Sequence, residues 1–149
     1  MYHQVIGFHI AISIGFIIIA FYILSRSFIR SHKNMDFNMF DRYLTLGYLI
    51  FMYLQLISGF SLYFFIRPSE NEHLLTLAQV NRNNALRFWV TEHIAMMFFA
   101  LALSQIGYLF IKNTTGNKRK YRHIIFYYGI STIVILISTG IAISRETNY

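Results

Sequence analysis

Four long stretches of the chain contain no Asp, Glu, Lys or Arg, and they dominate its hydrophobic pattern. These runs cover residues 1–25, 43–66, 93–111 and 123–144. A helix needs about 20 apolar residues to cross the hydrocarbon layer of a bilayer, which is roughly 30 Å thick. Each run has about that length, and only helices and closed barrels satisfy their backbone groups in lipid. The pattern therefore predicts a polytopic membrane protein whose spans are helical.

We predict helices over residues 4–27, 43–66, 87–112 and 122–144. The connections between them are short, and short connections make consecutive helices antiparallel neighbours. The first helix is expected to be retained, because it lacks the basic segment and the small-residue cleavage site of a signal peptide. The predicted fold class is all-α: one integral membrane domain over residues 1–149, folded as a four-helix up-down-up-down bundle.

Composition supports this class and excludes others. Hydrophobic residues make up 56% of the chain, charged residues 13%, and there is no cysteine. A soluble domain carries roughly a quarter charged residues, so this chain has too few for a water-facing surface. A soluble enzyme, a nucleic-acid-binding domain and a disulfide-stapled secreted module are excluded. Without cysteine, iron–sulfur and thiolate chemistry is excluded as well.

The distribution of charge predicts the orientation in the membrane. The net charge is +7, and most basic residues fall in two of the three connections. One predicted side carries Arg26, Arg30, Lys33, Arg42, Lys112, Lys118, Arg119, Lys120 and Arg122, whereas the other carries Arg67, Arg82, Arg87 and Arg145. The positive-inside rule places the first group in the cytoplasm and both termini outside. Anionic lipid headgroups favour such basic loops, so the bilayer itself is the expected partner and no nucleic acid is needed.

Polar residues inside the spans should face the interior of the bundle, because they are costly in lipid. We expect the serines and threonines to bond their own helices, and Gln55 to make an interhelical hydrogen bond. Tyrosines at or near helix ends are typical of an aromatic belt at the membrane interface. These are Tyr43, Tyr48, Tyr63, Tyr121, Tyr127 and Tyr128.

Two histidines share a predicted depth. His9 and His93 lie about one and a half turns from the outer ends of the first and third helices, which run in the same direction. Two imidazoles at one depth can ligate a haem iron from opposite sides. Packing or snorkelling histidines are the alternative, and the sequence leaves both open.

The surroundings of His93 are compatible with a haem. One face of the third helix becomes small beyond the histidine, leaving a groove for a flat macrocycle or for close helix packing. That face carries His93, Met96, Met97, Ala100, Ser104 and Gly107. Either Met96 or Met97 could replace one histidine as ligand. Arg87 and Arg82, toward the outer surface, are placed to pair with haem propionates.

Glu92 offers two further interpretations. Beside His93 it could mark a proton or quinone site, or it could join His9 and His93 around a divalent metal. The metal interpretation is the weakest, because adjacent helical residues point about 100° apart.

Four pieces of the chain resemble a family of small four-helix bacterial membrane proteins named cytochrome b. They are YHQVIGFH, which carries His9; QLISGFSLYF; RFWVTEHIAMMFFALAL, the most specific; and KYRHIIFYYGIS. The resemblance implies haem b and electron transfer in a bacterial inner membrane, with the termini in the periplasm. Family members tend to have histidines where this chain has Gln105 and Tyr121, so a second site is not expected and one haem is the most we predict.

These observations lead to two functional hypotheses. The first is a membrane-bound b-type cytochrome or cytochrome-like subunit with one bis-histidine haem near the outer face. It would exchange electrons with quinol and a partner, with Glu92 and Tyr63 as a proton or quinone site. The second is a cofactor-free accessory subunit of a larger membrane complex, such as a respiratory assembly, in which the polar residues hold the helices together.

Overall fold

A computed structural model describes residues 2–64 and 88–146, and every regular element in this part of the chain is helical. Two of the elements are short π-helices, named η, which continue directly into α-helices. The elements are α1 (Tyr2–His32), α2 (Met39–Phe64), η1 (Phe88–His93), α5 (Ile94–Asn113), α6 (Asn117–His123), η2 (Ile124–Tyr128) and α7 (Gly129–Glu146).

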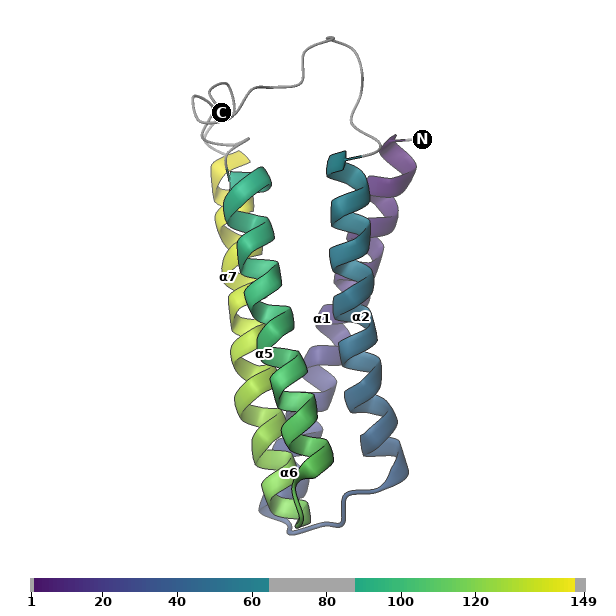
Figure 1. The fold of residues 1–149 in the computed structure, drawn as a ribbon, viewed down its shortest axis with the longest axis vertical. Coiled ribbons are helices and arrows are strands. Elements are labelled where there is room, and N and C mark those ends of the chain that lie inside the picture. The colour runs from purple at the N-terminus through teal and green to yellow at the C-terminus, as the bar shows by residue number, and fades with distance from the viewer. Residues whose placement is uncertain (1, 65–87, 147–149) are drawn as a thin grey trace.

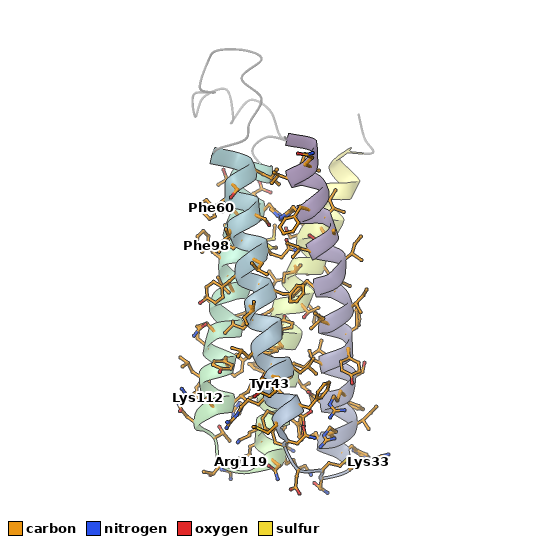
Figure 2. All side chains as sticks on the ribbon, turned by 90° about the vertical axis from the view of Figure 1, so that its right-hand side faces the viewer. Lys33, Tyr43, Phe60, Phe98, Lys112 and Arg119 are labelled. Carbon is orange, nitrogen blue, oxygen red and sulfur yellow. The ribbon has the colours of Figure 1, made fainter. Side chains whose placement is uncertain are left out.

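The helices form a four-helix up-down-up-down bundle, as predicted (Figure 1). Helices α1 and α2 make one antiparallel hairpin, and α5 packs against α7 in a second. The start of α1 and the end of α7 lie at the same end of the bundle, which we call the terminal end (Figure 1). Lys33, Lys112 and Arg119 lie at the opposite end, which we call the basic end (Figure 2).

Four helical segments are long and apolar enough to cross a membrane. They are Gln4–His32, Met39–Leu62, Thr91–Asn113 and Asn117–Ile141. Length and composition thus make the chain a multi-pass membrane protein. At the basic end α1 continues to His32 and α2 already begins at Met39, so the helices extend beyond the predicted limits of 27 and 43. A change from apolar to charged residues marks the end of the lipid span, and here the helix does not end with it.

Charged residues at the basic end remain helical because they pair between helices. Asp41 is 3% exposed, and its carboxylate lies 2.7 Å from Nε of Arg26 and 3.4 Å from Nε of Arg30. The hydroxyl of Tyr121 donates to the same carboxylate at 2.8 Å. Asp41 and Asn38 also cap the start of α2, each side chain accepting the other's backbone N–H. One carboxylate therefore joins α1, α2 and α6.

A tyrosine pair joins α2 to η2 in the middle of the bundle. The rings of Tyr48 and Tyr128 stack with centroids 4.2 Å apart and planes 11° apart. The Tyr48 hydroxyl lies 3.0 Å from Oγ1 of Thr132, and the Tyr128 hydroxyl donates to the backbone oxygen of Thr45 at 3.1 Å. Each tyrosine hydroxyl thus has a hydrogen-bond partner in the other hairpin.

The structure corrects the prediction that all six tyrosines form an aromatic belt at the membrane interface. Tyr48, Tyr121 and Tyr128 are fully buried inside the bundle, because each hydroxyl finds a hydrogen-bond partner there. Tyr43 is 63% exposed, as a belt residue would be. Tyr127 is half-buried and packs against α5. The side chain of Tyr63 lies outside the described residues.

The face of α5 that carries small residues packs against η2 and α7, which follow it in the same hairpin. A Cβ on Gly107 would lie 2.5 Å from Cβ of Tyr127, and the Ser131 hydroxyl donates to the backbone oxygen of Ala100 at 2.9 Å. Of the two uses predicted for this face, the structure shows close helix packing over Ala100–Gly107. A macrocycle has no room on this part of α5.

Gly107→Ala should destabilise the bundle, because the new methyl group meets the base of a side chain that cannot swing away. Overpacking of this kind costs about 1–3 kcal/mol. Gly140→Ala is the matched control, since a Cβ there has nothing within 4 Å. Thermal unfolding in detergent should give a lower midpoint for the first variant and an unchanged or higher midpoint for the second. Equal midpoints would contradict the close approach.

Asp41→Asn should also destabilise the protein, because a neutral amide leaves the buried Tyr121 hydroxyl and the half-buried Arg26 guanidinium poorly satisfied. The expected loss in unfolding free energy is about 1–3 kcal/mol. Asp36→Asn makes the same chemical change in an exposed residue of the same end, whose Oδ1 accepts from Asn117. Denaturation of both variants in one detergent would test this; similar losses would mean that Asp41 has no special role.

Candidate functional site

His9 lies on α1 near the terminal end and faces α2. Its Nδ1 is 2.8 Å from Oγ of Ser58, which is buried at 7% exposure. Its Cε1 would lie 3.6 Å from a Cβ on Gly59. The imidazole therefore lies against α2 at a position where the neighbouring residue has no side chain.

Hydrogen bonds between α1 and α2 form a closed ring around His9. The Gln55 amide donates to Oγ of Ser13 at 2.8 Å, and the Ser13 hydroxyl donates to the His9 backbone oxygen at 2.8 Å. The Ser58 hydroxyl donates to the Gln55 backbone oxygen at 3.0 Å. The predicted interhelical hydrogen bond of Gln55 is thus confirmed.

The tautomer of His9 decides the direction of its bond to Ser58, because either Nδ1 or the serine hydroxyl can donate. If Nδ1 carries the ring proton, the lone pair of the neutral imidazole is on Nε2, as in a metal-ligating histidine.

His93 has a similar arrangement in the other hairpin. It is the last residue of η1, and its Nδ1 lies 2.8 Å from Oγ of Ser138 on α7. Ser138 is fully buried, and His93 itself is half-buried. Single π turns inside α-helices are frequent at functional sites. Each histidine is therefore bonded through Nδ1 to a serine of the helix it packs against.

The two histidines belong to different hairpins. His9 is bonded to Ser58 within the α1–α2 hairpin, and His93 is bonded to Ser138 within the α5–α7 hairpin. Both lie near the beginning of their helical segments, at Tyr2 and Phe88. Their pairing at one haem stays a prediction.

Burial along α1 decreases toward the terminal end. The interior residues Phe16 and Ala20 are 1% and 0% exposed, whereas His9 and Ser13 are half-buried. The serines that bond the two histidines remain buried, with Ser58 at 7% and Ser138 at 0% exposure.

The other predicted site residues contribute less. Met96, Met97 and Glu92 are half-buried, and Met97 packs against the core. Within residues 2–64 and 88–146, no group of three or more His, Cys, Asp or Glu gathers that could hold a metal ion. The divalent-metal interpretation of Glu92 therefore gains no support. Arg82 and Arg87 lie outside the described residues, as does the side chain of Tyr63.

Gln105 and Tyr121, which stand where proteins of the resembled family tend to have histidines, each have a partner in the structure. Gln105 accepts a hydrogen bond from the Tyr53 hydroxyl at 3.1 Å, and Tyr121 belongs to the Asp41 cluster. His123 stacks on Phe110 with ring centroids 5.4 Å apart. These contacts give each residue a structural role at the basic half.

Sequence reasoning missed the two serines that hold the histidines. The sequence predicts that Ser58 and Ser138 bond their own helices, which is the ordinary behaviour of serine in a membrane helix. Ser58 does so at the Gln55 backbone oxygen, but each serine also bonds a histidine of the neighbouring helix. One signal was present, because Ser131 and Ser138 are seven residues apart and so share a face of α7. Nothing in the sequence paired that face with His93.

Comparisons with protein-family models, with characterised proteins and with solved structures found no match to this chain. The chemistry of the site is therefore judged from its residues alone. Imidazole is a suitable ligand for iron, and ligating histidines usually give their other ring N–H to a second group. His9 and His93, each bonded through Nδ1 to a serine, fit that donor set.

Proposed function

We propose that the protein is a membrane-bound b-type cytochrome or cytochrome-like subunit that carries electrons through one haem. The observation that supports this is the matched environment of His9 and His93. The two imidazoles come from opposite hairpins and are each bonded through Nδ1 to a serine. Together they would supply the two neutral nitrogen donors of a bis-histidine haem.

In this proposal the chain positions the iron ligands and excludes water, while the haem supplies one-electron chemistry. Ser58 holds His9 in the tautomer whose Nε2 carries the lone pair, and Ser138 orients His93. Met97, at the edge of the core, would lie beside the macrocycle. Arg82 and Arg87 remain the predicted partners of the propionates.

We place the site near the outer face of a bacterial inner membrane, with both termini periplasmic. Support comes from the excess of basic residues at the opposite end of the bundle and from the positive-inside rule. In that orientation quinol and other integral membrane subunits are the proposed electron partners. Glu92 and Tyr63 remain the proposed proton or quinone site.

Purified full-length protein should show the α-band of a low-spin haem in a reduced-minus-oxidised spectrum. His9→Ala and His93→Ala should each abolish the low-spin spectrum, because each removes one axial ligand. His32→Ala is the control, since that histidine is exposed at the basic end. Bands that survive both substitutions would leave a cytochrome but refute this ligand pair.

Ser58→Ala should keep the haem and raise its midpoint potential. A hydrogen bond at Nδ1 makes the imidazole a more basic ligand, and a more basic ligand favours ferric iron. Ser61→Ala is the matched control on the same helix, because that hydroxyl bonds only its own helix at the Ile57 oxygen among the described residues. Redox titration would measure both; equal potentials in the two variants would remove Ser58 from its positioning role.

The same hydrogen bonds also favour a second candidate function. Nδ1 of His9 and Nδ1 of His93 are satisfied by serines without any metal. A cofactor-free accessory subunit of a larger membrane assembly would use these residues to hold the helices of each hairpin together. Titration of the purified protein with haemin separates the two functions, because only the cytochrome should bind about one haem per chain with a low-spin spectrum.

A further inference from the structure

A cavity of about 150 Å³ lies at the basic end, apart from the histidine site. It is lined by Phe37, Arg42, Thr45, Tyr108, Ile111, Lys112 and Lys120. The lining comes from the segment before α2, from the first turns of α2, from the last turns of α5 and from α6. An engineered cavity of this size in another protein admits a benzene molecule, so the space is sufficient for a small ligand group.

The lining has three cations and no carboxylate. Arg42 and Lys112 are exposed, while Lys120 is half-buried with its Nζ 5.1 Å from the centroid of the Phe37 ring. Three positive charges around one small cavity repel one another unless an anion is bound between them.

The nearby carboxylates are engaged elsewhere. Asp41 turns toward Arg26, Arg30 and Tyr121, and Asp36 accepts a hydrogen bond from Asn117. At the basic end, the described residues form ion pairs between Asp41 and those two arginines. The charges of Arg42, Lys112 and Lys120 are thus left for a ligand.

We propose that this cavity is a phosphate-binding site. Lysine and arginine are the side chains that proteins use to bind phosphate oxygens, and basic pockets between membrane helices bind the headgroups of anionic lipids. The cavity lies at the ends of the spanning helices, and its wall also contains Phe37 and Ile111. We therefore expect the bound phosphate group to belong to a phospholipid headgroup. A soluble phosphate compound is the alternative source.

The test compares two triple variants of the full-length protein in detergent. Arg42→Gln, Lys112→Gln and Lys120→Gln together remove the cations of the cavity. Lys118→Gln, Arg119→Gln and Arg122→Gln remove the same charge from exposed positions at the same end. Binding is measured from the rise in unfolding midpoint with ligand concentration, because a ligand that binds only the folded state stabilises it.

Three probes distinguish the sources: phosphatidylglycerol in mixed micelles, phosphatidylcholine in the same micelles, and sodium pyrophosphate without added lipid. We expect phosphatidylglycerol to raise the midpoint of the wild type more than phosphatidylcholine does. The cavity variant should lose at least about tenfold in apparent affinity, since each basic residue near an anionic surface contributes about 1 kcal/mol. The control variant should lose much less.

Each outcome bears on the proposal. Stabilisation by pyrophosphate alone, lost in the cavity variant, supports a phosphate site with a soluble ligand. Equal losses in the two triple variants would show a diffuse basic surface and overturn the proposal, as would the absence of stabilisation by any probe. Should the cavity variant fail to fold, Lys112→Gln against Lys118→Gln makes the same comparison with one exposed charge each.

Discussion

A polar side chain inside a lipid span must find its hydrogen-bond partner within the protein. The bundle meets this constraint at three depths along its axis. Near the terminal end it pairs His9 with Ser58, and in the middle it pairs Tyr48 with Thr132. At the basic end it gathers two arginines around Asp41. Among the described residues no buried side-chain nitrogen or oxygen lacks a partner. The positions of the polar groups thus determine which helices pair and in which register.

The two halves of the bundle meet this constraint in different ways. In the basic half Tyr121, Ile124 and Tyr128 are fully buried, and a cavity is lined by residues of α2, α5 and α6. The terminal half relies on hydrogen bonds within each hairpin, and its interior residues His9 and Ser13 stay half-buried. Close packing of α5 leaves no room for a large flat group along Ala100–Gly107, and for this reason the haem is proposed nearer the terminal end. The same asymmetry puts the proposed haem and the basic cavity at opposite ends.

The sequence predicted the four helices because a run of about 20 residues without a charge has the length and composition that a helix needs to cross a bilayer. It could not predict where the helices end, since Arg30 and Asp41 lie beyond the predicted limits and pair with each other across two helices. It assigned Tyr48 and Tyr128 to the interface because a phenol is amphipathic and suits either a belt or a core with a hydrogen-bond partner. The histidine pair was predicted from helix direction and depth. Their serine partners depend on helix rotation, which the sequence pattern does not specify.

The choice of histidine at positions 9 and 93 bears on the two proposed functions. A residue that only joins α1 to α2 needs a hydrogen-bonding group toward Ser58, and an amide or a hydroxyl could supply it. Histidine has a second ring nitrogen that can ligate a metal when the first carries the proton. In the proposed cytochrome, Ser58 accepts the Nδ1–H of His9 and leaves the lone pair on Nε2. His93, in the opposite hairpin, is bonded through Nδ1 to Ser138. A bis-histidine haem requires two such nitrogens, and for this reason we propose the cytochrome ahead of the accessory subunit.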